Sequence, residues 1–174
     1  MKSSIVTRPA TGQDLAAITA LQARVFGPGR FARSAYRVRE GHGLMSRFCR
    51  VADCDGRLIA TVRITVATIG GVPGAALLGP VAVDPEFRGQ GYGRQLVSEA
   101  LDALKAAGFS LVVLVGDEPY YGRFGFKPVP FKSIAFPGPV NPARILAVEL
   151  VAGALPRYRG LVAAAPTPDG GGNA

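Results

Sequence analysis

The stretch GPVAVDPEFRGQGYGR, residues 79–94, is the most informative part of the sequence for predicting the fold, because it predicts the end of a buried strand, a glycine-rich loop and the start of a helix. It starts near the end of an almost continuous apolar run over residues 75–83, which predicts a strand buried on both faces. Because Pro80 has no N–H to donate, this strand is expected to carry a bulge or to form an edge at that point. Beyond the strand, the chain enters a loop with three closely spaced glycines, Gly89, Gly91 and Gly93.

A helix is predicted after this loop, from residue 91 to about residue 107, with Gly108 as its end. Its apolar residues recur at helical spacing and are Leu96, Val97, Ala100, Leu101 and Leu104. At the start of such a helix, backbone N–H groups and the positive end of the helix dipole point at one spot, which favours an anion. Two common phosphate loops do not fit, because no lysine follows the glycines and the dinucleotide fingerprint would need its third glycine where Arg94 or Leu96 stands.

The rest of the chain predicts strands and helices around this unit. Alternating or apolar runs bounded by turn residues predict strands over residues 4–8, 48–54, 57–69, 110–115, 125–129 and 145–151. Helical spacing predicts helices over residues 11–26 and 31–40 and a short helical turn over residues 119–123. The early strands are linked by hairpins, and a right-handed crossover follows. We therefore expect an α/β (α+β) fold, with a mixed sheet of six to seven strands flanked by helices on both faces.

Composition limits the classes of function. The chain has 174 residues, is 48% hydrophobic and contains one histidine, His42, and two isolated cysteines, Cys49 and Cys54. These numbers predict one globular domain and make a metal site, a disulfide framework or a Ser/His/Asp hydrolase improbable. No apolar run is long enough to span a membrane and the first residues lack a signal-peptide core, so a cytoplasmic protein is expected. The domain is expected to cover residues 1–151, followed by an Ala/Pro/Gly-rich tail, 152–174, whose end is disordered.

The formal net charge of +8 indicates an anionic partner without identifying it. Nucleic acid, an anionic membrane and a small anionic ligand are three interpretations, and a solvated basic surface is a fourth. The basic residues are not interleaved with aromatic ones on a strand face, and no nucleic-acid motif is present, so neither nucleic acid nor membrane is expected as a partner.

Two motifs resemble those of the GNAT superfamily of N-acetyltransferases. The acetyl-CoA motif of that family, V-x-P-x-[YF]-[RQ]-[GR]-x-G-[IYL]-G, is matched at Val83, Pro85, Phe87, Arg88, Gly91 and Gly93. The segment Tyr121-Gly122-Arg123-Phe124-Gly125-Phe126 is similar to the family's Y-x-[KR]-x-G-F segment. The order and separation of the two motifs also fit, and the resemblance covers at least residues 4–130.

The resemblance implies a centrally splayed sheet and acetyl-CoA as the cosubstrate, with no metal. The pantetheine arm would insert beside the strand that carries Pro80, and the backbone of Val81 and Val83 would bond its amides. The expected cofactor-binding residues are Val81, Ala82, Val83, Arg88, Gly89, Gln90, Gly91, Tyr92, Gly93 and Arg94.

The implied reaction is direct attack of a neutral amine on the acetyl-CoA thioester. Tyr121 matches the family tyrosine that acts as general acid for the departing thiolate, and its reference pKa near 10 keeps it protonated at pH 7. Tyr120 is its internal competitor for this role, and simple packing of either ring is the alternative. A backbone N–H of the strand over residues 79–83 would stabilise the oxyanion.

The general base and the acceptor are not identified by the sequence. The strand that carries a glutamate in many family members has no acidic residue here, so Glu40 and His42 are candidates only by residue type. Arg33 and Arg37 are four residues apart on the predicted basic helix and would orient a carboxylate or phosphate of the acceptor, or form a solvated face. A module of the same fold that binds acyl-CoA without turnover remains an alternative, and a homodimer is a further expectation.

Overall fold

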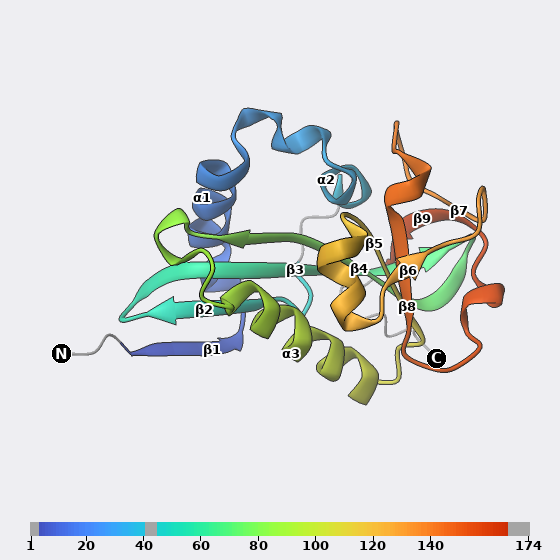
Figure 1. Ribbon diagram of the computed structural model, residues 1–174. Helices are drawn as coiled ribbons and strands as arrows, with labels where there is room; N and C mark the ends of the chain where they lie inside the picture. Colours follow the sequence, from blue (N-terminus) through green and yellow to red (C-terminus); the bar gives the residue numbers. More distant parts are fainter. Residues whose placement is uncertain (1–3, 41–44, 167–174) are drawn as a thin grey trace.

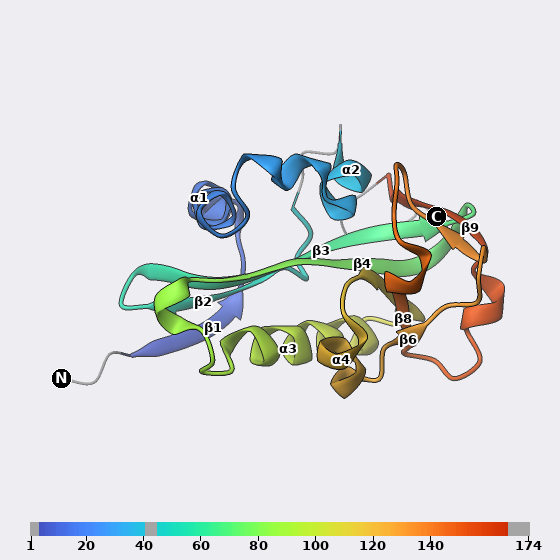
Figure 2. The same cartoon turned by 45° about the horizontal axis from the view of Figure 1, so that its top comes forward.

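A twisted sheet runs through the whole molecule, with α1 and α2 against one face and α3 and α4 against the other (Figures 1 and 2). The computed structural model describes residues 4–40 and 45–166. The helices are α1 (Leu15–Phe26), α2 (Ser34–Arg39), α3 (Tyr92–Ala106) and α4 (Glu118–Tyr121). The strands are β1 (Ile5–Pro9), β2 (Arg50–Cys54), β3 (Arg57–Ile69), β4 (Val72–Val83), β5 (Leu111–Val115), β6 (Lys127–Pro128), β7 (Ile134–Ala135), β8 (Ile145–Glu149) and β9 (Gly160–Ala164).

The main path of the sheet follows the order β1-β2-β3-β4-β5-β8-β6. Every neighbouring pair along this path is antiparallel except β4 and β5, which are parallel and are linked through α3. The predicted fold class, a mixed sheet that is antiparallel first and then locally parallel with helices on both faces, is confirmed. Nine strands are present among the described residues instead of the six to seven expected.

The break predicted at Pro80 is present and has two parts. On the β3 side, Val62 pairs with Val81 and Ile64 pairs with Leu78, so that β4 carries an extra residue in a bulge opposite Arg63. On the other side, β4 pairs with β5 only over residues 75–77. Beyond Leu77 the two strands separate, and the splayed sheet that the family resemblance implied is observed.

The core confirms the face predicted for the helix after the glycine loop. In α3, Leu96, Val97, Ala100 and Leu104 are fully buried against the sheet, and Leu101, the fifth residue of the predicted face, is partly buried. Ile18 and Leu21 of α1 are fully buried on the opposite face. Gly108 adopts a φ of +90°, and this left-handed conformation ends the helix as expected. Helices α1 and α3 thus pack on opposite faces of the sheet next to the region where β4 and β5 separate.

The expected domain end at residue 151 has to be corrected for the described residues. The sequence 160–164 forms β9, which pairs with the last residues of β3 and also with β7. Val162 of β9 is buried in the core, so this part of the Ala/Pro/Gly-rich segment belongs to the fold. The strand was missed because GLVAA has no alternation of polar and apolar residues. Residues 167–174, where disorder was expected, lie outside the described residues.

The second predicted helix is shorter than expected, because residues 28–32 form a 3₁₀ turn and α2 starts only at Ser34. Arg33 is therefore the residue before the helix rather than part of it. Within the described part of the chain, no helix combines the length and the apolar character that a membrane crossing requires.

Candidate active site

The loop between β4 and α3 forms a groove in which three glycines leave the backbone exposed. Gly91 stands directly before α3 with a φ of +89°, and Gly89 has a φ of +77°, so both positions favour glycine. Gly93 lies in the first turn of α3, and a Cβ atom there would come within 3.2 Å of a methyl of Val83 and 3.4 Å of the Tyr120 hydroxyl. The groove has a volume of about 360 Å³ and is lined by Val83, Phe87, Arg88, Gly89, Gly91, Tyr92, Gly93, Arg94, Tyr120 and Arg123.

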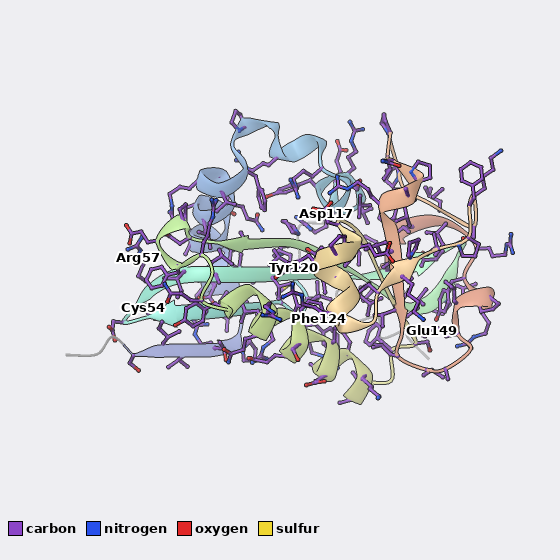
Figure 3. All side chains as sticks on the ribbon, in the orientation of Figure 1. Cys54, Arg57, Asp117, Tyr120, Phe124 and Glu149 are labelled. Carbon is purple, nitrogen blue, oxygen red and sulfur yellow. The ribbon has the colours of Figure 1, made fainter. Side chains whose placement is uncertain are left out.

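Asp84 fixes the entrance to this loop. One oxygen of its buried carboxylate accepts a hydrogen bond from the Glu86 backbone N–H at 3.0 Å. The other oxygen accepts hydrogen bonds from Arg57 at 2.8 Å and Arg24 at 3.3 Å. The Glu86 N–H and the two guanidinium groups hold the pKa of Asp84 below its usual range, against the opposing effect of burial. Arg57 lies at the end of the molecule where β4 turns toward α3 (Figure 3).

The free edge of β4 leads from this groove toward the middle of the sheet. The Asp84 N–H donates to the Ile59 carbonyl of β3 at 2.8 Å, so the Val83 carbonyl on the same peptide points away from β3. Because backbone groups alternate along a strand, Val81 also turns its N–H and C=O toward the splay, whereas Ala82 turns its own toward β3. Val81 and Val83 thus present backbone groups there that pair with no other strand among the described residues. Ala82 is buried with its backbone facing β3, and Gln90 is exposed outside the groove lining.

A second cavity opens where β4 and β5 separate. It has a volume of about 280 Å³, and its walls come from the residues before and within α2, from β4, and from the loop that precedes β8. Its lining residues are Arg33, Ser34, Ala35, Leu77, Leu78, Gly79, Pro80, Val81, Val115, Tyr121, Pro139, Val140, Asn141 and Arg144. Val81 lines this cavity and Val83 lines the groove, so the free edge of β4 connects the two.

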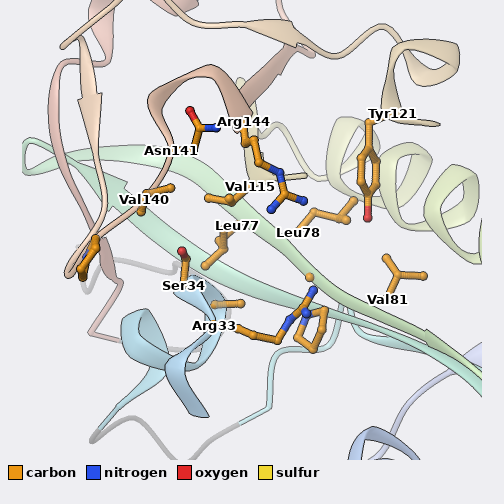
Figure 4. Close-up of a pocket in the computed structure, with 14 residues that line it drawn as sticks. Arg33, Ser34, Leu77, Leu78, Val81, Val115, Tyr121, Val140, Asn141 and Arg144 are labelled. Carbon is orange, nitrogen blue, oxygen red and sulfur yellow. The ribbon is translucent and has the colours of Figure 1, made fainter. Parts of the chain in front are cut away.

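Tyr121 points into the second cavity, and its hydroxyl end is directed toward β4 between Leu78 and Val81 (Figure 4). Its ring packs edge-on against Phe126 and against Tyr120, with centroid distances of 6.0 Å and 4.8 Å. A Cβ atom on Gly116 would lie only 2.6 Å from the Tyr121 ring, so the glycine leaves the space that the ring occupies. The two tyrosines are thus separated by the fold: Tyr121 lines the cavity, while Tyr120 lines the groove.

Burial raises the pKa of Tyr121 to about 12, and the neighbouring Arg33 and Arg144 guanidinium groups oppose this shift. The hydroxyl therefore stays protonated throughout the neutral range. A thiol has a reference pKa near 8.5, so complete proton transfer from Tyr121 to a thiolate is unfavourable by roughly 5 kcal/mol. Tyr121 is suited to donate a hydrogen bond to a leaving sulfur, and to release its proton only if it gains another.

Of the residues predicted to bind the acceptor, the structure places Arg33 in the lining of the second cavity but not Arg37 or Glu40. Arg33 lines the second cavity, and its guanidinium also lies 4.3 Å from the centroid of the Phe26 ring. Arg37 is absent from the lining and instead packs over Gly138. Glu40 follows α2, is exposed and is not a lining residue. His42 lies outside the described residues. The shared face expected for Arg33 and Arg37 does not form, because α2 starts after Arg33.

Sequence reasoning missed the residues that the loop before β8 contributes. Asn141 and Arg144 line the cavity opposite Arg33, and Arg144 also pairs with Asp117 at 3.2 Å. Nothing in their local sequence signals a site, since they lie in a Pro-rich segment that folds as a 3₁₀ turn. Among the described lining residues of this cavity there is neither a carboxylate nor a histidine. No group of three His, Cys, Asp or Glu side chains is close enough to hold a metal within residues 4–40 and 45–166.

Comparisons of sequence with known proteins agree on one family. A family model described as an acetyltransferase (GNAT) domain matches residues 6–129. The chain is 36% identical over 115 residues to YhbS of Escherichia coli K12, described as an uncharacterized N-acetyltransferase, and the match covers 66% of this chain and 68% of that protein. It is 29% identical over 118 residues to a second such protein of the same organism, YjhQ, over 66% of this chain and 65% of that one.

Comparisons of structure extend this similarity to nearly the whole chain. The crystal structure of YhbS from Escherichia coli in complex with CoA superposes with a TM-score of 0.78 and 29% identity, and covers 98% of both chains. A GNAT family acetyltransferase from Brucella melitensis in complex with acetyl-CoA gives a TM-score of 0.61 and 30% identity, over 83% of this chain and 96% of the other.

Proposed function

The chain belongs to the GNAT superfamily of N-acetyltransferases, and from this premise we propose that it transfers the acetyl group of acetyl-CoA directly to a primary amine of a small molecule or protein. The observation that carries the proposal is the free edge of β4, which leads from a glycine-rich groove at the start of α3 to a cavity lined by Tyr121. Two structural neighbours are described as complexes with CoA and with acetyl-CoA, which supports this cosubstrate. A cytoplasmic location and a homodimer stay predictions.

The groove is suited to the pyrophosphate of acetyl-CoA. Gly89, Gly91 and Gly93 leave the main chain accessible, and the start of α3 adds N–H donors and the positive end of its dipole. Arg88, Arg94 and Arg123 add charge at the rim. The pantetheine arm would then follow β4, where Val83 and Val81 present unpaired backbone groups, and would deliver the thioester beside Tyr121.

In the reaction, the amine nitrogen forms a bond to the thioester carbonyl carbon, and the carbon–sulfur bond then breaks. The Val81 N–H faces the splay and is our candidate for stabilising the carbonyl oxygen as it becomes negative. Tyr121 donates a hydrogen bond to the departing sulfur and gives up its proton as it gains the one that the amine loses. The products are the amide and the CoA thiol, so atoms and charge balance for a neutral amine.

The surrounding arginines explain how the amine could react without a nearby base. A positive field disfavours an ammonium ion and so lowers the pKa of a bound amine. Arg33 and Arg144 line the cavity, and Arg39 lies behind its wall. A larger fraction of the amine is then neutral at pH 7 than in water, which reduces the need for either Glu40 or His42.

Two measurements test the proposal. Acetyl-CoA at 100 times its Kd should stabilise the folded protein by about 2.7 kcal/mol, which a thermal shift detects. Release of free CoA in the presence of an amine, above the rate with buffer alone, shows transfer. No thermal shift at millimolar acetyl-CoA would exclude the proposed cosubstrate.

A module that binds acyl-CoA without turnover is the second candidate. The observation in its favour is that no carboxylate or imidazole is found among the described residues of the cavity lining. It predicts the same thermal shift with acetyl-CoA but no CoA release over a broad panel of amines, so the second measurement distinguishes the two functions.

A further inference from the structure

The cavity beside Tyr121 has guanidinium groups on opposite walls. Arg33 enters from the residue before α2 and Arg144 from the loop before β8, and both reach toward the middle of the cavity near the Tyr121 hydroxyl (Figure 4). Both groups act electrostatically on the Tyr121 hydroxyl, which agrees with this placement. A ligand between them would meet two forks of N–H donors next to the position proposed for the thioester.

Two more arginines do not line this cavity but lie next to residues that do. Arg39 donates a hydrogen bond at 3.1 Å to the carbonyl of Gly79, one of the lining residues. Arg63 lies on β3 opposite the bulge that contains Gly79 and Pro80. It is only 8% exposed, and its Nε finds no hydrogen-bond partner among the described residues. Burial and the charge of Arg63 together lower the pKa of Arg39 to about 10.

This positive charge is poorly balanced within the protein. In the part of the chain that the structure describes, no carboxylate pairs with Arg33, Arg39 or Arg63, and only Arg144 has such a partner, Asp117. Arg33 and Arg144 are exposed to solvent in part, but Arg63 is buried and Arg39 is half-buried. Buried charges are normally paired, because an uncompensated charge away from water is costly. An anionic group bound in the cavity would supply the missing counter-charge.

We propose that the acceptor is a small amine that carries its own oxyanion group, a carboxylate or a phosphate, which Arg33 and Arg144 bind while the amine faces the thioester beside Val81. The proposal rests on the acetyl transfer proposed above and names its substrate class. Guanidinium groups suit this task because their planar N–H forks match the oxygens of carboxylates and phosphates. The volume of about 280 Å³ fits an acceptor of this size, and the positive charge disfavours a polyamine.

Matched pairs of acceptors test the proposal directly. Glycine, β-alanine and γ-aminobutyrate are each compared with their uncharged amides, and O-phosphoethanolamine with ethanolamine, by the rate of CoA release. Since the amides have a lower amine pKa, kcat/KM is expressed per neutral amine. We expect at least one anionic acceptor to exceed its uncharged partner by about tenfold or more, the usual effect of a charge-assisted hydrogen bond. Amino acids and the phosphate compound distinguish the two sources of the oxyanion.

Variants then assign the effect to the two arginines. Arg33→Gln and Arg144→Gln should each raise the KM of the preferred anionic acceptor about tenfold, with the KM for acetyl-CoA unchanged. Arg157→Gln is the matched control, because Arg157 is exposed, lies 5.8 Å from the centroid of the Tyr158 ring and does not line the cavity. Calorimetry with CoA shows whether each variant still folds and binds.

The outcomes separate this inference from the function on which it rests. Equal or faster acetylation of the uncharged partners, or no acetylation of any panel member by a protein that binds CoA, would overturn the anionic acceptor. Acetylation of the uncharged amines would still support the transferase. Failure to bind CoA at all would instead overturn the proposed function itself.

Discussion

The groove before α3 and the cavity beside Tyr121 are built from different materials. The groove comes mainly from the loop between β4 and α3 and the first turn of α3, where glycines expose backbone N–H groups, and Tyr120 and Arg123 complete its lining. The cavity comes from four stretches that lie far apart in sequence, residues 33–35, 77–81, 115–121 and 139–144, and its polar side chains include Arg33, Tyr121 and Arg144. A backbone site can keep one ligand while side chains vary, whereas a side-chain site can change its ligand by substitution. Under the proposed function, the cosubstrate and the acceptor would therefore be recognised by parts of the molecule that can vary independently.

The largest effect is expected from a substitution that changes the backbone conformation of the groove loop. Gly91→Val places a β-branched residue at a φ of +89°, a conformation that such residues strongly avoid. The loop must rearrange and misdirect its N–H donors, so the Kd for CoA, measured by calorimetry, should rise about 100-fold.

Gly71→Val is a matched control for this change. Gly71 has a φ of +81°, and a Cβ added there would likewise meet no atom within 4 Å. It lies in the hairpin between β3 and β4, at the opposite end of β4 from Val83 and the groove. The variant should lose stability without a comparable loss of CoA affinity. Equal losses of affinity in both variants would show that general destabilisation, and not the loop, explains the effect.

The second-largest effect is expected from a substitution in the cavity. Tyr121→Phe removes the donor proposed for the leaving sulfur but keeps the ring against Phe126 and Gly116. We expect kcat to fall at least tenfold while the KM for acetyl-CoA changes little, as measured by steady-state CoA release. Tyr120→Phe is the control, since Tyr120 lines the groove, and it should retain most of kcat. Full turnover in Tyr121→Phe would remove Tyr121 from the mechanism.

The difference between the two regions also explains what could be predicted from the sequence. Strand, glycines and helix form a local pattern, so the groove, the bulge at Pro80 and the helix after the loop were predictable from residues 75–108. The placement of Tyr121 followed from a second local motif. Arg144 could not be found, because its role depends on how the loop before β8 folds back over the splay. Helical spacing placed Arg37 beside Arg33 on the assumption that one helix contains both, but α2 begins at Ser34 and Arg37 is not among the lining residues. Its role toward the acceptor stays a prediction.

Strand β9 could not be predicted either, because it too depends on long-range folding. Its pairing with the end of β3 depends on the chain returning across the molecule, and GLVAA carries no periodic signal for it. Ala67, Thr68 and Ile69 of β3 leave that edge open, because β2 pairs only with the first half of the strand. Long-range pairing of this kind is determined by the vacant edge and not by the local sequence.

A smaller effect is expected from substitution of Asp84, whose contacts support the groove loop. Asp84→Asn keeps an oxygen for the Glu86 N–H but removes the charge that holds Arg57 and Arg24. Both arginine side chains are about half exposed, so the loss should be limited to roughly 1 kcal/mol of stability and a few-fold higher Kd for CoA. Denaturant unfolding and calorimetry measure the two quantities. Asp102→Asn is the control, because Asp102 is exposed on α3 and takes part in none of these contacts, so it should affect neither quantity.

Asp84 also predicts a dependence of stability on acid. Its folded-state pKa is lowered, so its contribution is complete above the usual value of 3.8 and is lost as the pH falls below it. The difference in stability between the wild-type protein and Asp84→Asn should therefore narrow on acidification from pH 6 toward pH 3. A difference that stays constant over this range would mean that the carboxylate is not held in its ionised form by these partners.

The last prediction concerns the pH dependence of kcat/KM, on which the ionisation of Tyr121 is expected to have no effect. Since burial raises the pKa of Tyr121 to about 12, its hydroxyl should remain protonated from about pH 7 to pH 10. Over the same interval the neutral fraction of the free amine grows. We therefore expect kcat/KM to rise with pH and to show no descending limb below about pH 10. A descending limb near pH 9 to 10 that disappears in Tyr121→Phe would show a phenol with an ordinary pKa, and hence a cavity open to water beside β4. A limb that persists in that variant would point to another group and would leave the buried position of Tyr121 intact.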